Sequence, residues 1–376
     1  MGRGMTANES TTTTAVSESH QKTHSDTARV LFDISHPAHA HLFKNAITEL
    51  SARGHRTFVT SREKECTTEL LDAYQIEHIP ISSQGAGLFD LATEWVGRER
   101  QLWSVVRSFN PDVVVSYLSP AAHVASLAGC ASVVYLDGEN QQLLGRLTAP
   151  FTNVICTPAN FEKSFGSKQF RYDGFHELAY LHPNRFDPDP EVLEAHGIVV
   201  DEPYYVLRFV SWDAHHDIGD QGFSRAAKRE LVEYLDEHGE VYISSEDRLP
   251  DYFEQYRVPI PPEAIHDLLY FANLYVGESA TMATEASVLG TPAVRSNSYA
   301  GTTDDMSNFR ELEEQYDLLY SSPDEDAAIA RVKEFIADPT TKETWQRRRD
   351  RLLAEKIDVT EQMVELILAE AGCHAR

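Results

Sequence analysis

The sequence predicts an α/β protein with two doubly wound lobes that face each other across a cleft. Two separate series of short apolar segments alternate with amphipathic helical segments, and a stretch rich in Pro, Asp and Glu at residues 181–203 divides them. The chain has 376 residues, which is enough for two domains of ordinary size. Strands and helices that alternate in this way form parallel sheets covered on both faces, with the ligand site outside the carboxyl ends of the strands.

The first series begins with a buried strand at residues 29–34. Apolar residues then recur at helical spacing over residues 42–50, and Gly54 provides a C-cap before the next strand at residues 56–60. This order is a βαβ unit, so the strands should be parallel with a right-handed crossover. The further elements expected here are helices at 67–73, 91–109 and 121–129 and strands at 77–81, 111–115, 132–136 and 154–157, the last before a connector.

The second series starts with a strand at residues 204–208. The further strands expected are at 240–244, 274–276 and 293–294, with helices at 224–238, 268–272 and 282–289 and a helical tail from residue 324.

The domain assignment follows from these two series. We assign residues 28–185 to the first lobe, 186–203 to the linker and 204–376 to the second lobe, and we allow the last helices to pack back on the first lobe. Residues 1–27 are polar and rich in Ser and Thr, which predicts a disordered tail.

The formal charge of the chain is -26, with 59 acidic residues against 33 Lys and Arg. The acids are spread along the chain, a distribution that favours a halophilic protein, because molar salt screens most of their mutual repulsion. An acidic interaction surface is the alternative. No basic stripe is present to neutralise phosphates, which argues against nucleic acid as a partner.

The sequence also predicts where the protein is located and whether it binds a metal or a cofactor. No window approaches roughly 18 consecutive apolar residues, so we expect no transmembrane helix, although peripheral contact with a membrane stays open. Thr11 to Thr14 stand where a signal peptide needs apolar residues, which favours a cytoplasmic protein. The four cysteines form no C-x-x-C pair, which favours free thiols, and we expect neither a metal nor a cofactor.

The segment from Val276 to Ala286 carries the sharpest functional signal. A strand ends at Val276, a loop of small residues follows, and a helix is expected from Thr281. Small residues let a phosphate approach the backbone, and the free N–H groups at a helix start point at it. Ser279 and Thr281 add hydroxyl donors, and Glu285 lies where its carboxylate can accept from ribose hydroxyls. The alternative is a plain N-cap at Ser279 with a solvated Glu285.

This segment resembles the second-domain signature of GT-B enzymes, which in the non-hydrolysing UDP-GlcNAc 2-epimerases reads D-S-G-G-x-x-x-E-A-x-x-L-G-x-P. The GlcNAc transferase that makes lipid II has a related version. The resemblance implies that Glu285 binds the ribose and that the preceding loop holds the diphosphate. The loop residues assigned to the diphosphate are Glu278, Ser279, Ala280 and Thr281, of which Ala280 and Thr281 replace two glycines.

The whole chain from Arg29 is identified as a member of domain-of-unknown-function family 354, an archaeal family grouped with GT-B proteins. Two segments carry this resemblance, from Asp33 to Phe43 and from Gly277 to Arg295. It implies two Rossmann-like lobes in the GT-B arrangement, with a nucleotide-diphosphate sugar, expected to be UDP-linked, bound in the cleft.

Residues 35–41 read Ser-His-Pro-Ala-His-Ala-His and are expected to form a loop after the first strand. In GT-B folds this loop faces the cleft. A histidine here could act as a general base on an acceptor hydroxyl or donate to a phosphate, so His36 and His39 are candidate catalytic residues. A structural set of loop histidines is the first alternative. A metal site is the less favoured one, because no carboxylate lies among the histidines.

Two further loops follow strands and are expected to reach the cleft. Asp137, with Glu139, follows a first-lobe strand, where the resemblance implies a general base or a contact to sugar hydroxyls; two solvated acids are the alternative. Arg208 ends the first strand of the second lobe, which suits bidentate binding of phosphate, and the alternative is an Arg held in a salt bridge. Ser211 and His215 accompany Arg208 as expected substrate contacts.

His266 precedes the diphosphate loop in the sequence. In related GT-B enzymes this segment lies beside the nucleotide base, so His266 is assigned as a substrate contact. A histidine that merely starts a helix is an equally favoured alternative.

These residues favour glycosyl transfer over 2-epimerisation. Ser116 and Tyr117 stand where the epimerases have a Gly-Asp pair, and a second epimerase glutamate has no clear counterpart near residues 145–151. An inverting transfer asks only for a diphosphate clamp and one base, and needs no metal if dipoles and Arg offset the leaving charge. The sequence therefore predicts a metal-independent GT-B glycosyltransferase acting on an unknown acceptor, with surface glycan or glycolipid synthesis as its setting. A 2-epimerase and a non-catalytic nucleotide-sugar-binding protein are the alternatives.

Overall fold

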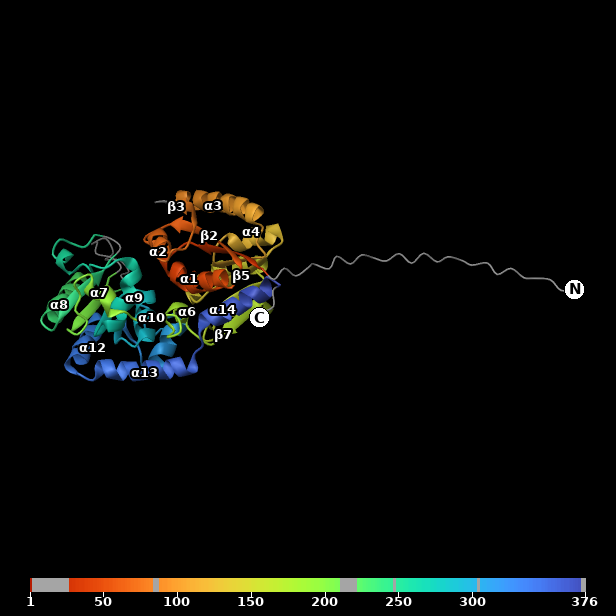
Figure 1. Cartoon of the computed structure of the whole chain (residues 1–376). Coiled ribbons are helices and arrows are strands. Elements are labelled where there is room, and N and C mark those ends of the chain that lie inside the picture. The colour runs from red at the N-terminus through yellow and green to blue at the C-terminus, as the bar shows by residue number, and fades with distance from the viewer. Residues whose placement is uncertain (2–26, 84–87, 210–221, 246–247, 303–304, 373–376) are drawn as a thin grey trace.

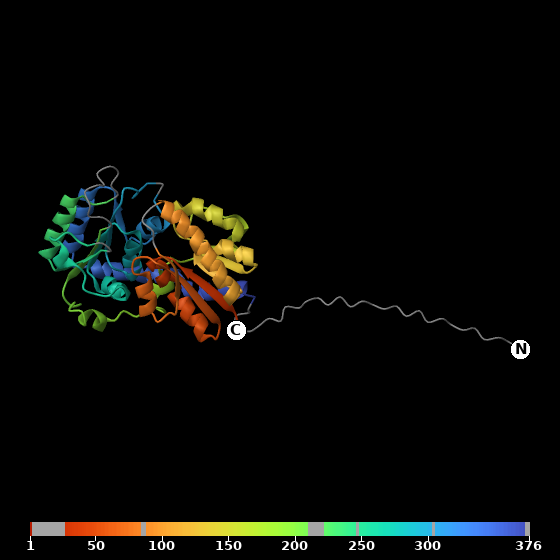
Figure 2. The same cartoon turned by 90° about the horizontal axis from the view of Figure 1, so that it is seen from above.

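The computed structural model describes residues 1, 27–83, 88–209, 222–245, 248–302 and 305–372. Within these ranges the chain forms two α/β lobes that lie beside each other in both views (Figures 1 and 2). The two-lobe prediction is confirmed. The expectation of a disordered tail falls, except at its two ends, outside the described residues.

The first lobe contains a seven-stranded parallel sheet in the order β3-β2-β1-β4-β5-β6-β7. Its strands are β1 (Arg29–Ile34), β2 (Arg56–Glu63), β3 (Ile79–Ser83), β4 (Val113–Tyr117), β5 (Ala131–Tyr135), β6 (Val154–Pro158) and β7 (Gln169–Tyr172). Its helices are α1 (Pro37–Ala52), α2 (Thr67–Ala73), α3 (Leu88–Phe109), α4 (Ala121–Ala128), α5 (Gln142–Thr148) and α6 (Leu178–Leu181). Because β1 pairs with both β2 and β4, the strand order reverses there, which opens a crevice after Ile34.

The core of this lobe follows from the alternation of side chains along β1. Val30 and Phe32 face α1 and α6, whereas Leu31 packs with α3 and α4 on the other face. Both faces of the sheet are therefore buried, as expected for an all-parallel sheet.

The second lobe contains a five-stranded sheet, also parallel, in the order β12-β11-β10-β8-β9. Its strands are β8 (Tyr204–Arg208), β9 (Glu240–Ser244), β10 (Leu274–Gly277), β11 (Ala293–Ser296) and β12 (Tyr320–Ser322). Its helices include α7 (Pro190–Glu194), α8 (Arg225–Asp236), α9 (Ile265–Phe271), α10 (Ala280–Leu289) and α11 (Ser307–Arg310). The strand order reverses between β8 and β10, where Arg208 lies opposite Gly277 in the register.

Two expectations about the first lobe are wrong. The strand at residues 154–157 is not its last, because β7 follows it and forms the edge of the sheet. The segment 35–41 is not a loop throughout, because α1 begins at Pro37. His36 is the N-cap and accepts the Ala38 N–H at Nδ1 over 3.2 Å, while proline at the first helical position loses no hydrogen bond.

Three helices end the chain: α12 (Glu325–Ala337), α13 (Thr341–Glu355) and α14 (Val359–Glu370). α12 packs on β11 in the second lobe and α13 lies along α10, whereas α14 packs against α1 and α6 of the first lobe (Figure 1). Arg185 secures this return, because its guanidinium pairs with Glu49 of α1 and with Asp358, the N-cap of α14. Of the helices in the described ranges, none is long and apolar enough to cross a membrane.

A buried ion pair in the second lobe leads to a stability prediction. Arg295 of β11 is 2% exposed, pairs with Asp305 and lies 3.6 Å over the ring of Phe309. Asp305→Ala leaves a buried guanidinium without its carboxylate, so we expect the free energy of unfolding to fall by about 3–5 kcal/mol in chemical denaturation. The control is Asp251→Ala, which breaks the exposed pair with Arg248 and should leave the unfolding midpoint unchanged. Equal effects of both variants would contradict the prediction.

Candidate active site

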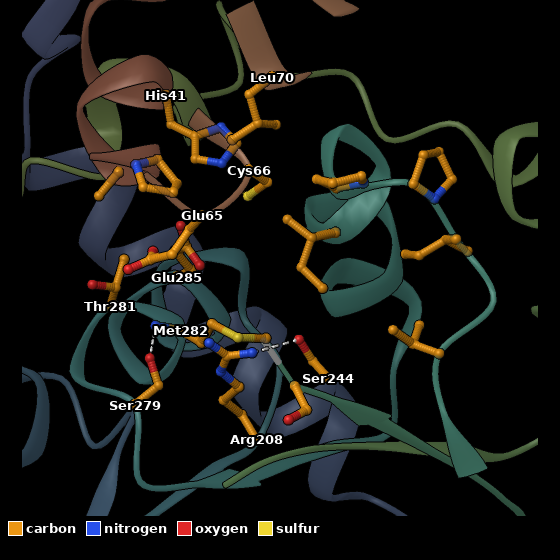
Figure 3. A pocket seen from close by; sticks show the side chains of 18 of the residues that line it. His41, Glu65, Cys66, Leu70, Arg208, Ser244, Ser279, Thr281, Met282 and Glu285 are labelled. Atoms are coloured by element: carbon orange, nitrogen blue, oxygen red, sulfur yellow. Dashed lines mark hydrogen bonds between the residues drawn. The ribbon is translucent and has the colours of Figure 1, made fainter. Parts of the chain in front are cut away.

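A cavity of about 500 Å³ lies between the two lobes at the carboxyl ends of their central strands. The first lobe contributes the start of α1 and the start of α2, and the second lobe contributes the ends of β8 and β9 and the start of α10 (Figure 3). Residues on its wall include His36, Pro37, Ala38, His41, Glu65, Cys66, Arg208, Ser244, Arg257, Val258, Ile260, Pro261, Pro262, Ser279, Thr281, Met282 and Glu285. We call this space the first cavity.

The floor of the first cavity is the switch point between β8 and β10. Arg208 lies there with its guanidinium donating to the hydroxyl oxygen of Ser244 over 3.3 Å (Figure 3). Gly277 ends β10, and a Cβ at this position would lie 2.4 Å from the Tyr275 hydroxyl oxygen and 2.6 Å from the Arg208 carbonyl oxygen. Only glycine fits, so this residue lets the two strand ends approach and sets Arg208 beside the loop that follows β10.

The loop after β10 starts α10 at the edge of the first cavity. Ser279 is the N-cap, and its hydroxyl oxygen accepts the Met282 N–H over 3.4 Å, while its own O–H stays available as a donor. Ala280 and Thr281 are the first helical residues, and no residue from 277 to 281 has a positive φ. The two glycines of the related signature are therefore not required by this backbone. The first N–H groups of α10 have no acceptor within the helix and suit an anion.

Glu285 is a buried carboxyl group that joins the lobes. Its side chain is 4% exposed, and Oε1 accepts the Tyr180 hydroxyl over 2.8 Å and pairs with Nε2 of His266 at 3.0 Å. Tyr180 belongs to α6 of the first lobe, whereas His266 belongs to α9 of the second. The alternative of a solvated helix acid is thus wrong. Both contacts involve Oε1, and no hydrogen bond from a described residue is seen to Oε2.

His266 does not reach the first cavity directly. It is 1% exposed and enclosed by aromatic rings, with centroids at 4.5 Å for His41, 5.1 Å for Tyr180 and 6.2 Å for Phe186. Its Nε2 faces Glu285, which does line the cavity. The geometry therefore gives His266 the task of orienting Glu285 in place of the direct substrate contact expected from the sequence.

The three histidines at the start of α1 point to different places. His36 lines both the first cavity and a second, adjoining one. His39 lines only the second cavity and stacks on Tyr117 at 4.5 Å, whereas His41 lines only the first and contacts the Tyr74 hydroxyl over 2.9 Å. Positions two apart on a helix differ by about 200° around the axis, so His39 and His41 must diverge.

Burial controls the protonation of these histidines. It lowers the pKa of His36, and it lowers the pKa of both His39 and His41 well below the usual range, with neighbouring histidines adding to the effect. The imidazoles are therefore neutral at pH 7. A neutral imidazole can accept a proton, which is the property that a general base needs.

The second cavity has a volume of about 330 Å³ and shares His36, Ala38 and Thr281 with the first. Asp137 lies on its wall and accepts the Tyr117 hydroxyl over 2.6 Å. Glu139, in contrast, reaches across to α11, where it binds the N–H and hydroxyl of Ser307. The two acids therefore have different environments, and neither is simply solvated.

Glu278, in the loop after β10, contacts groups near the start of α8. It is 9% exposed, accepts the Phe223 N–H over 2.8 Å and pairs with Lys228 of α8 at 3.1 Å. It lies on the wall of neither cavity, so its expected diphosphate contact is not what the geometry offers. Ser211 and His215 lie outside the described residues.

Several site residues were missed in the sequence. Tyr180 holds Glu285, and His176, Glu177 and Tyr180 all line the second cavity. They belong to the segment 175–181, which is otherwise apolar and precedes the linker. A His-Glu pair in an apolar run is the one signal that could have singled them out. Across the described ranges, no group of three or more His, Cys, Asp or Glu side chains is arranged to hold a metal ion.

Two parallel α/β lobes with a cavity between their strand ends define the GT-B class of proteins. Within that class, the chain belongs to the family described as Protein of unknown function (DUF354), which matches residues 28–369. It is 25% identical over 280 residues to an uncharacterized protein of Methanocaldococcus jannaschii, with 70% of this chain and 80% of the relative covered.

Solved structures show the same fold. A UDP-GlcNAc 2-epimerase from Neisseria meningitidis bound to UDP-GlcNAc is similar with a TM-score of 0.60 and 13% identity, over 91% of this chain and 100% of the other. MurG from Acinetobacter baumannii is similar with a TM-score of 0.55 and 14% identity, over 91% of this chain and 99% of the other. At these identities the likeness concerns the fold alone.

The contact between Tyr180 and Glu285 leads to the second prediction. Tyr180→Phe removes one donor from a buried carboxyl oxygen, so we expect the free energy of unfolding to fall by about 1–3 kcal/mol. Tyr252→Phe is the matched control, because its hydroxyl also binds a glutamate, Glu233 at 3.0 Å, but on the surface. Denaturation should leave the control unchanged. If Tyr180→Phe also left the free energy of unfolding unchanged, the hydrogen bond from Tyr180 to Glu285 would not contribute to stability, and the prediction would be wrong.

Proposed function

We propose that this chain is a glycosyltransferase-like enzyme that binds a nucleotide-diphosphate sugar, with UDP as the expected nucleotide, between its lobes. One observation carries the proposal: Arg208, the start of α10 and the carboxyl group of Glu285 line one wall of a single cavity. A cation and free N–H groups suit a diphosphate, and a carboxylate suits the ribose hydroxyls next to it. Its volume of about 500 Å³ is in the range of small-molecule sites.

Each part of the ligand has a matching part of the wall. The diphosphate would lie at Ser279 and Thr281 beside Arg208, with the backbone N–H of Ala280 at the start of α10 between them. The nucleotide base would lie against the mainly apolar run of Val258 to Pro262. The sugar would then extend past Thr281 and His36, two of the three residues that the first and second cavities share.

The second cavity supplies the groups for chemistry. His36, His39 and Asp137 line it, and His39 or Asp137 could accept the proton of an attacking acceptor hydroxyl, whereas His36, whose Nδ1 already accepts the Ala38 N–H, presents its Nε2–H as a donor. The leaving diphosphate would be stabilised by Arg208 and the start of α10, since preorganised donors and dipoles stabilise charge as it develops. Transfer by direct displacement then needs no metal.

A 2-epimerase is the second candidate, and one observation favours it. Glu177 lines the second cavity together with Asp137, so the cavity contains two carboxyl groups. Burial raises the pKa of Glu177 well above its usual range, so one acid is protonated while its neighbour can act as a base. This pair partly replaces the epimerase acids that the sequence lacks.

The binding proposal is tested by thermal shift in molar KCl with a panel of nucleotides and nucleotide-diphosphate sugars. We expect UDP and UDP-sugars to raise the melting temperature. Arg208→Ala should weaken UDP binding roughly 10- to 100-fold, because it removes a charge-assisted contact to phosphate. Arg248→Ala is the matched control, since Arg248 is exposed on a surface loop. Absence of any shift with the wild-type protein would overturn the proposal.

The chemistry is tested with UDP-GlcNAc and wild-type protein. Incubation without an acceptor should leave UDP-GlcNAc intact in NMR spectra, and UDP should be released when acceptors are supplied. Formation of UDP-ManNAc would instead establish the epimerase. Binding without either product, together with unchanged pathway function of His36, His39 and Asp137 variants, would identify a non-catalytic nucleotide-sugar-binding protein.

A further inference from the structure

One residue that lines the second cavity carries a buried polar atom without a partner among the described residues. His176 is 6% exposed and lines this cavity, and its Nε2 is buried with no hydrogen-bond partner. A buried polar atom without a partner costs folding free energy, so such an atom on a cavity wall points to a ligand group that completes it.

The tautomer of His176 follows from its other nitrogen. Nδ1 lies 2.5 Å from the hydroxyl of Tyr172, and this is the one hydrogen bond recorded for that hydroxyl among the described residues. Burial raises the pKa of Tyr172 well above its usual range, so the phenol keeps its proton. A buried O–H without an acceptor costs free energy, and Nδ1 is the one acceptor recorded for this hydrogen in the described ranges, so the phenol donates to Nδ1. Burial also lowers the pKa of His176, so the ring is neutral. A neutral imidazole that accepts at Nδ1 carries its hydrogen on Nε2, and the unpartnered atom is therefore a donor.

An acceptor lines the same cavity. Asp137 receives the hydroxyl of Tyr117 over 2.6 Å, and the ring of Tyr117 packs edge-on against His176 at 6.0 Å. One tyrosine thus contacts both groups, so His176 and Asp137 lie near each other at the cavity. A donor beside a carboxylate matches a hydroxyl group, which can accept from one partner and donate to the other. A carboxylate or phosphate ligand would be repelled by Asp137.

We propose that the second cavity binds a hydroxyl group of the sugar carried by the nucleotide, with His176 Nε2–H donating to the hydroxyl oxygen and Asp137 accepting its hydrogen. This inference rests on the proposed function. The sugar enters from the first cavity, because Thr281 at the start of α10 lines both spaces. His176 is then a residue that recognises the sugar, and Tyr172 positions it by fixing its tautomer.

The test compares the affinities of UDP and UDP-GlcNAc, measured by calorimetry in molar KCl. His176→Phe keeps a planar ring and removes the donor, so UDP-GlcNAc binding should weaken about tenfold while UDP binding stays unchanged. Unchanged UDP binding also shows that the variant is folded. Tyr172→Phe keeps the imidazole and frees its tautomer, so the loss of UDP-GlcNAc affinity should be smaller.

His123→Phe is the matched control. The Nε2 of His123 is likewise buried without a partner, but this residue lies on α4 and lines neither cavity. It should leave both affinities unchanged. If His176→Phe weakened both ligands equally, or neither, the inference would be wrong while nucleotide binding stood. If the wild-type protein bound neither ligand, the proposed function itself would fail.

Discussion

One buried carboxyl group joins the two lobes at the cavity between them. Glu285 belongs to α10 of the second lobe, and its Oε1 binds Tyr180 of the first lobe and His266 of the second. A group this deeply buried is tolerated only because both partners are present. The arrangement of the cavity depends on Glu285, since this residue joins the lobes and is also the one expected to bind the ribose hydroxyls.

The start of α1 divides the interlobe space into two chemically distinct parts. Because the helix begins at Pro37, its histidines are distributed by helical geometry, with His41 toward the first cavity and His39 toward the second. The first cavity is bounded by Arg208 and the start of α10, which suit charge. The second is bounded by imidazoles, phenols and carboxyl groups, which suit hydroxyls and proton transfer. The two cavities thus differ in chemical character although they adjoin each other.

The sequence predicts the scaffold better than the site. The strands, the helices ended by glycine and the loop with a helix start after Val276 could be predicted because each follows a local rule. The orientation of the side chains could not be predicted. Glu278 and His266 are adjacent in sequence to cavity residues, yet neither lines a cavity: Glu278 binds the Phe223 N–H, and His266 binds Glu285. Tyr180 was missed because its contact with Glu285 arises from the docking of two lobes, and His176 because its neighbours Tyr117 and Tyr172 are far from each other in the sequence; no local pattern records either contact.

The position of α14 has a consequence for how the protein is made. This helix contains almost the last of the described residues, yet it covers α1, one of the first elements to leave the ribosome. Buried side chains such as Val364 and Ile367 close the apolar face of the first lobe. That face therefore stays uncovered throughout translation of the second lobe. The first lobe is completed only when α14 has been synthesised.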